Sequence, residues 1–115
     1  MSYRGSCHCG RIAFEVQGEI ESLMECNCSI CTKRGSLLWF VPRASLALTT
    51  PAENLSTYTF NQRKIKHHFC PVCGCAPYAE GTDPKGNPMA AISARCLDGV
   101  DLTAFRRQPF DGRSL

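Results

Sequence analysis

Most of the cysteines in this chain fall into three short clusters whose spacing is typical of metal ligands. The clusters are C-x-C at 7–9, C-x-C-x-x-C at 26–31 and C-x-x-C-G at 70–74. Thiols one or two residues apart rarely bridge each other but converge readily on a metal ion. The N-terminus shows no basic head followed by an apolar run and a cleavage site, so we expect a cytoplasmic protein, in which disulfides are rare. The clusters therefore predict bound metal, and their spacing suits zinc better than an iron–sulfur cluster.

The first and last clusters together offer four ligands for one closed zinc site. In an extended segment, Cys7 and Cys9 project their sulfurs to the same side. In C-x-x-C-G, a tight turn aims Cys70 and Cys73 at one ion, and the glycine accepts the positive φ that the turn requires. Four thiolates complete a tetrahedral shell, which is typical of a structural site. We expect this site to join an early and a late strand. Structural zinc in small peptides supplies about 10 to 16 kcal/mol of binding free energy, so the site would add stability to the fold.

The middle cluster offers three ligands, Cys26, Cys28 and Cys31. Three protein ligands leave an open position for water or substrate, as in catalytic zinc sites. Cys31 falls near the start of a predicted short helix, where backbone amides favour the thiolate. The alternative is that Cys75 or Cys96 supplies a fourth thiolate and closes the site. Otherwise these two cysteines are expected to be a redox pair or buried small side chains.

The segments that must position these clusters are short and mainly β. Residues 11–17 alternate apolar and polar side chains, which is the period of a half-buried strand. Similar runs predict strands at 23–26, 37–41, 56–60, 65–69, 76–79 and 89–94. Helix signals are limited to one turn at 29–34, closed by Gly35, and another at 101–106 with Asp101 as its cap. The aromatic residues of the predicted strands are expected in the core, namely Trp39, Phe40, Tyr58, Phe60, Phe69 and Tyr78.

Composition and charge narrow the class of protein. A chain of 115 residues with 43% hydrophobic side chains and no low-complexity tract or linker predicts one domain over residues 1–115. No apolar stretch approaches the roughly 20 residues that a membrane helix needs. The net charge of +3 is small and scattered, which argues against a nucleic-acid surface but suits a small anionic ligand. Nothing in the sequence defines an oligomeric state.

With these clusters in place, the chain resembles the glutathione-dependent formaldehyde-activating enzyme family, which also includes centromere protein V. The resemblance runs through GSCHCGRIAFEV, ECNCSICTKRGSL, the FN of YTFN, HHFCPVCG and the tail ARCLDGVDL…FDGR. The CNCSIC segment is more like the centromere protein V branch, because many formaldehyde-activating members have His where Asn27 stands. The resemblance implies a mainly β fold of the kind called Mss4-like, or β-tent, that holds two zinc ions.

Carried over by motif, the resemblance divides the cysteines as their spacing does. It implies a structural zinc held by Cys7, Cys9, Cys70 and Cys73 and a catalytic zinc held by Cys26, Cys28 and Cys31. The implied activity is that of a carbon–sulfur lyase, which makes or breaks the bond between the glutathione sulfur and the carbon of formaldehyde, as in S-hydroxymethylglutathione. Zinc coordination deprotonates a thiol. Three protein thiolates make the site net negative and the zinc a weaker Lewis acid than one held by histidines, so the site suits thiol binding better than water activation.

Arginine and histidine side chains are the remaining candidates for substrate binding and catalysis. Arg34 and Arg95 each lie within three residues of a cysteine and are the best candidates to bind the carboxylates of glutathione. His8, His67 and His68 are weak candidates for a general base, since His8 points away from its cluster and at most one of the adjacent pair can face a site. The alternative to an enzyme is a zinc-stabilised β module that binds a protein or nucleic-acid partner and catalyses nothing. A fourth protein ligand at the middle cluster would favour that alternative.

Overall fold

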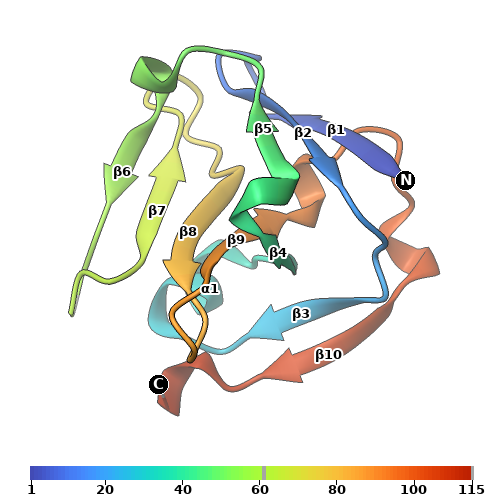
Figure 1. Cartoon of the computed structure of the whole chain (residues 1–115), viewed down its shortest axis with the longest axis vertical. Coiled ribbons are helices and arrows are strands. Elements are labelled where there is room, and N and C mark those ends of the chain that lie inside the picture. Colours follow the sequence, from blue (N-terminus) through green and yellow to red (C-terminus); the bar gives the residue numbers. More distant parts are fainter. Residues whose placement is uncertain (61, 115) are drawn as a thin grey trace.

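The computed structural model describes residues 1–60 and 62–114, which form two β-sheets and one short α-helix (Figure 1). The strands are β1 (Ser2–Ser6), β2 (Ala13–Gln17), β3 (Ser22–Cys26), β4 (Leu38–Pro42), β5 (Leu46–Leu48), β6 (Ser56–Tyr58), β7 (Lys66–Phe69), β8 (Tyr78–Thr82), β9 (Pro88–Ser93) and β10 (Arg106–Phe110). The helices are α1 (Ser29–Arg34) and the 3-10 turns η1 (Arg43–Ser45), η2 (Ala52–Asn54), η3 (Ala94–Cys96), η4 (Leu102–Ala104) and η5 (Gly112–Ser114). The smaller sheet has the strand order β1-β2-β5, and the larger has the order β10-β3-β4-β9-β8-β7-β6.

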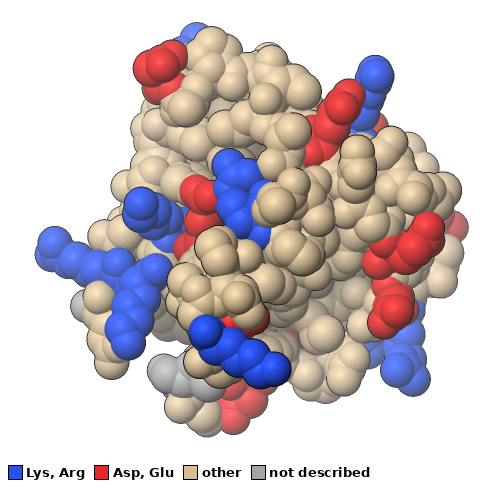
Figure 2. All heavy atoms as spheres, viewed as in Figure 1, with Lys and Arg blue, Asp and Glu red and all other residues tan. Residues whose placement is uncertain are grey.

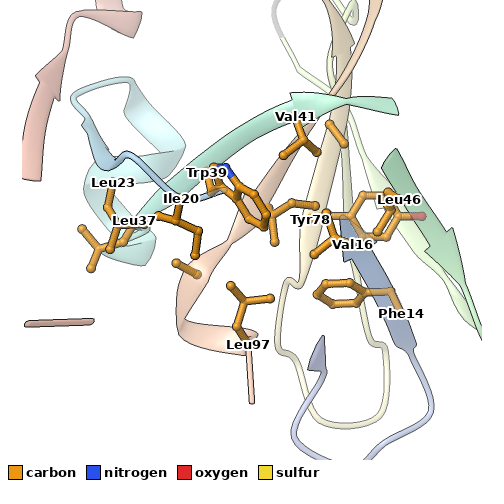
Figure 3. Packing of buried hydrophobic residues seen from close by; sticks show 13 residues of the cluster. Phe14, Val16, Ile20, Leu23, Leu37, Trp39, Val41, Leu46, Tyr78 and Leu97 are labelled. Atoms are coloured by element: carbon orange, nitrogen blue, oxygen red, sulfur yellow. The ribbon is translucent and has the colours of Figure 1, made fainter. Parts of the chain in front are cut away.

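Alternating side chains of both sheets form the main hydrophobic core (Figure 3). Phe14 and Val16 contribute from β2, and Trp39 and Val41 contribute from β4; all four are buried. Because successive residues of a strand point to opposite faces, the side chains between these positions are directed away from the core. The larger sheet therefore has an inner face that packs on the core and an outer face that does not.

The expected mainly β fold, with short strands and little helix, is confirmed. The predicted strands are all present within a few residues of their expected bounds, and α1 occupies the predicted 29–34. The sequence does not predict β1, β5 or β10. In β10 the four residues before Phe110 are all exposed, so no apolar alternation marks the segment. Its extended form comes from parallel pairing with β3.

Two local predictions are confirmed only in part. Residues 101–106 do not form a helical turn throughout: Asp101 accepts a hydrogen bond from the Thr103 amide at 3.0 Å, but only η4 follows, and the chain then extends to pair with β3. Among the aromatic residues, Trp39 and Tyr78 are buried as expected, whereas Phe40 is 36% and Tyr58 50% exposed. The last two side chains lie on the outer face of the larger sheet, which is turned away from the core.

Charged side chains of both signs are dispersed over the face shown in Figure 2, with basic ones gathered at the edge formed by β6 and β7. This distribution agrees with the small net charge of +3. Among the described residues, none of the helices has the length and apolar character that spanning a bilayer would require.

Candidate metal centres

Four cysteines from two distant segments meet in one cluster, as their spacing predicts. Cys7 and Cys9 lie between β1 and β2, and Cys70 and Cys73 directly follow β7. Their sulfur atoms all lie within 4.8 Å of one another. The Cys7 and Cys9 sulfurs are 3.8 Å apart, and those of Cys9 and Cys70 are 3.6 Å apart. A tetrahedral zinc ion with Zn–S bonds of about 2.3 Å places its sulfurs about 3.8 Å apart, so this donor set fits zinc.

The segment that carries the first two cysteines is a turn and not the extended segment that we expected. The Gly10 amide donates a hydrogen bond to the Cys7 carbonyl at 3.3 Å, which closes the turn. The two sulfurs nevertheless converge, because the turn brings them to the same side. The glycine after the last cluster behaves as predicted: Gly74 has a φ of 82° and donates its amide to the Cys70 carbonyl at 2.8 Å.

Two members of this four-cysteine cluster are buried in a small apolar surround, whereas Cys73 is half-buried and Cys9 is exposed. Cys70 is fully buried, Cys7 is 2% exposed, and both belong to one small buried cluster with Ile12. Backbone amides point at the sulfurs: Ile12 donates to the Cys7 sulfur and Cys73 donates to the Cys70 sulfur, each at 3.4 Å.

Backbone amides also control ionisation in this cluster. Hydrogen bonds from the amides of Cys75 and Cys9 lower the pKa of Cys73 to about 5. The amide of Cys73 lowers the pKa of Cys70 in the same way. Because thiolates are the form that binds metal, these amides favour the metal-binding form of Cys70 and Cys73.

The middle cluster is built around the start of α1. Cys26 ends β3, Cys28 is the N-cap of α1, and Cys31 lies in the helix. Their sulfurs lie within 4.8 Å of one another, and all three side chains are half-buried. The helix ends as predicted at Gly35, which has a φ of 68° and donates its amide to the Cys31 carbonyl at 2.8 Å.

The cysteine most prone to ionise in this three-cysteine cluster is not the one that we expected. Although burial opposes ionisation, hydrogen bonds from the amide and the thiol of Cys31 lower the pKa of Cys28. Burial raises the pKa of Cys31 itself, and it also raises that of Cys26. The amides at the start of α1 therefore lower the pKa of the N-cap residue, Cys28. They do not lower that of Cys31, which lies three residues later.

Within residues 1–60 and 62–114, no fourth histidine, cysteine or acidic side chain joins the three-cysteine cluster. Cys75 packs against the four-cysteine cluster. Cys96 also lies near the four-cysteine cluster. Burial raises the pKa of Cys96, and the nearby thiols of Cys75 and Cys7 raise it further. The structure thus places neither extra cysteine at the middle cluster. All nine cysteines are free thiols.

Sequence reasoning missed the C-terminal tail as part of the three-cysteine cluster. The Asn27 amide group donates to Asp111 at 2.9 Å, and its oxygen accepts from the Arg113 backbone amide at 2.8 Å. Between these two contacts lies Gly112, where a Cβ would come within 2.5 Å of the Cys26 sulfur. The Asp-Gly pair signals a turn in the sequence, but nothing local indicates where that turn packs.

The predicted carboxylate-binding arginines both lie at the end of α1. Arg34 is the last helical residue and is exposed. Arg95 is exposed as well, and its Nε donates to the Gly35 carbonyl at 3.2 Å. His8 is exposed and is not among the side chains that converge in the cluster beside it. Asn61, from the FN motif, lies outside the described residues.

The two adjacent histidines point to opposite faces of the larger sheet, as predicted. His68 points inward, where its ring nitrogens contact Thr57 at 2.8 Å and Glu80 at 2.6 Å. Glu80 also forms an ion pair with Arg43. His68 is therefore fully engaged, whereas His67 faces outward.

Fold and clusters together define a mainly β protein with two cysteine sites able to hold metal ions. A family model described as glutathione-dependent formaldehyde-activating enzyme matches residues 2–109, and the chain belongs to this family. The crystal structure of a Rhodobacter sphaeroides protein, solved as a structural genomics target, is similar to this chain with a TM-score of 0.78 and 27% sequence identity. The match covers 91% of this chain and 99% of that one. The predicted family and the fold that it implied are confirmed.

Proposed function

We propose that the chain is a zinc-dependent carbon–sulfur lyase that acts on a glutathione adduct of a small aldehyde, such as S-hydroxymethylglutathione. Membership of a family named for glutathione-dependent formaldehyde activation supports this proposal. The observation that carries it is the three-cysteine cluster, which gathers three sulfurs within 4.8 Å without a fourth ligand among the described residues. A site of this kind leaves room for one exogenous ligand.

Two zinc ions per chain would be divided between the clusters. Cys7, Cys9, Cys70 and Cys73 would hold the structural ion, and Cys26, Cys28 and Cys31 would hold the catalytic one. When bound at the three-cysteine cluster, zinc would favour the thiolate form of an incoming thiol. Glutathione fits such a site because its thiol is a soft ligand that matches three soft ligands already present.

Residues of the chain would orient the substrate. The exposed guanidinium groups of Arg34 and Arg95 lie at the end of the helix that carries Cys31, and each can bind a carboxylate through paired N–H groups. Asn27 and Gly112 would hold the C-terminal tail against the cysteines, and so fix the shape of the cluster. We further propose that the protein works in the reducing cytoplasm, where nine free thiols are stable.

Glutathione binding tests this function directly. Zinc-loaded protein should bind glutathione and release a proton near neutral pH, since the bound thiol ionises. Calorimetry in two buffers of different ionisation enthalpy measures that proton, and Cys28→Ser should abolish the signal. Exchange NMR at equilibrium should then show that the protein accelerates formation and breakdown of the glutathione–formaldehyde adduct beyond the spontaneous rate. Binding without acceleration would refute lyase activity on the formaldehyde adduct and leave a thiol-binding protein or an enzyme for another adduct. Absence of binding would favour a zinc-stabilised module that binds a macromolecular partner.

A further inference from the structure

An aromatic side chain of β10 lies directly beside the three-cysteine cluster. Phe110 and Cys26 are paired in register at the ends of β10 and β3. The Asn27 backbone amide donates to the Phe110 carbonyl at 3.1 Å, which holds the end of β10 in place. A Cβ on Gly112 would lie 2.5 Å from the Cys26 sulfur and 3.6 Å from the Phe110 ring. The ring and the sulfur therefore border the same small space.

A second aromatic ring extends this apolar surface over the larger sheet. Phe40 of β4 packs against Phe110, with ring centroids 5.4 Å apart and an interplanar angle of 51°. Its neighbours Trp39 and Val41 are buried in the core, so Phe40 lies on the outer face. Phe40 is 36% exposed and Phe110 is half-buried. The two rings thus present part of their apolar surface to solvent next to the cluster.

The outer face of β3 continues this surface into a hollow. Because Leu23 is buried in the core, Met24 and Cys26 are directed to the outer face. Met24 and Phe40 border a hollow of about 160 Å³. The other residues that line it are Glu19, Glu21, Ser22 and Trp39. A cavity of about 150 Å³ can hold a benzene molecule, so a short carbon chain has room here.

The chemistry of these groups suits one part of a glutathione adduct better than the other. Glutathione itself carries carboxylates, for which Arg34 and Arg95 at the end of α1 are the candidates. The phenyl rings and the thioether of Met24 carry no charge and favour apolar groups. The sulfur of a bound adduct would lie at the three-cysteine cluster, and the former carbonyl carbon is bonded directly to that sulfur. The substituent on this carbon is therefore the part of the adduct that comes nearest to Phe110.

We propose that Phe40 and Phe110 are specificity-determining residues that bind the carbon chain of the aldehyde, an inference that rests on the proposed function. The substrates that use this surface are glutathione adducts of aldehydes with a short apolar chain, such as butanal. Formaldehyde has only hydrogen atoms in place of the chain, so its adduct gains nothing from the two rings. The protein accordingly accelerates the exchange of the butanal adduct more than that of the formaldehyde adduct.

Phe40→Ala, compared with Tyr58→Ala as the matched control, tests the proposal. Tyr58 is also an exposed aromatic residue of the outer face, but three strands separate it from Phe40 in the larger sheet. Exchange NMR measures how far each protein accelerates the two adducts beyond their own spontaneous rates. Burial of one methylene group strengthens binding about fourfold. We therefore expect Phe40→Ala to lower the acceleration at least about 10-fold for the butanal adduct, with the formaldehyde adduct and zinc content unchanged. Tyr58→Ala should keep both accelerations.

A second measurement on the wild-type protein does not depend on the folding of a variant. In NMR spectra, glutathione with butanal should shift the ring signals of Phe40 and Phe110 more than glutathione with formaldehyde does. Nuclear Overhauser contacts should join these rings to the methylene protons of the bound adduct. Catalysis with unshifted rings, with no preference for the butanal adduct, or with an equal effect of Phe40→Ala on both adducts would overturn this proposal and leave the lyase intact. Acceleration of neither adduct by the wild type would overturn both.

Discussion

Removing a ligand from the four-cysteine cluster should destabilise the fold far more than removing one from the three-cysteine cluster. The two perturbations to compare are Cys7→Ser and Cys28→Ser. Cys7 is 2% exposed and packs with Ile12 in a small apolar cluster that is separate from the main core. Cys28 is half-buried and lies outside both apolar clusters. The four-cysteine cluster has little apolar area to hold it together once the ion is lost. The three-cysteine cluster is held in place by the sheet and the C-terminal tail around it.

The size of the effect follows from the geometry of the donor set. Sulfur separations of 3.6 and 3.8 Å match a tetrahedral zinc site, which supplies about 10 to 16 kcal/mol in small peptides. Loss of only a quarter of about 12 kcal/mol, about 3 kcal/mol, is a large part of the 5 to 15 kcal/mol that typically stabilises a domain. At about 4 °C for each kcal/mol in a chain of this size, Cys7→Ser should melt about 12 °C lower or fail to fold. Cys28→Ser should melt less than about 4 °C lower.

Thermal unfolding followed by circular dichroism, together with elemental analysis, measures both effects. Wild-type protein should carry close to two zinc ions per chain, and folded Cys28→Ser should carry close to one. Equal loss of stability in the two variants would refute the division between a structural and a catalytic site. A reproducible value near one ion in the wild type would remove the separate catalytic ion.

Two further predictions concern residues that are not metal ligands. Gly112→Ala should lower zinc occupancy at the three-cysteine cluster and keep the fold, because its Cβ would come within 2.5 Å of the Cys26 sulfur; a wild-type zinc content would contradict the tail packing. Glu80→Gln should reduce the amount by which the free energy of unfolding falls between pH 7 and pH 3. Although burial opposes ionisation, hydrogen bonds from His68 and Arg43 lower the pKa of Glu80, so it stabilises the fold above its unfolded pKa and this contribution is lost as pH falls through the lower folded value. Urea unfolding between pH 7 and pH 3 measures this, and parallel curves for variant and wild type would count against it.

Local signals in the sequence explain why some elements are predictable. The short helix α1 needs only a capping position, a turn of suitable residues and Gly35 in the left-handed region, and all of these lie within eight residues. The convergence of the cysteines within each cluster is equally local. The turn at Cys7 differs from the predicted extended form, yet the spacing alone brings its sulfur to that of Cys9.

The parts that could not be predicted depend on contacts distant in sequence. β10 has no apolar alternation, and its geometry comes from pairing with a strand about 80 residues earlier. In β1 the one buried residue is Gly5, where a Cβ would come within 2.5 Å of the Phe14 ring. Only the packed structure reveals that a side chain there would collide. The role of Asn27 as the anchor of the tail is hidden for the same reason, since its partners lie more than 80 residues away.

The negative charge of the three-cysteine cluster explains why positive charge and hydrogen-bond donors near it would matter for thiol binding. Three thiolates around a divalent ion leave a net charge of −1, and a fourth thiolate would make it −2. Such a centre is a weak Lewis acid and tolerates the extra thiolate only if positive charge or hydrogen-bond donors lie nearby. Arg34 and Arg95 supply exposed positive charge at the end of α1, and the amide and thiol of Cys31 lower the pKa of Cys28 although burial opposes this. With zinc bound, the same weakness would let a bound thiol leave, as the proposed reaction near equilibrium in both directions would require.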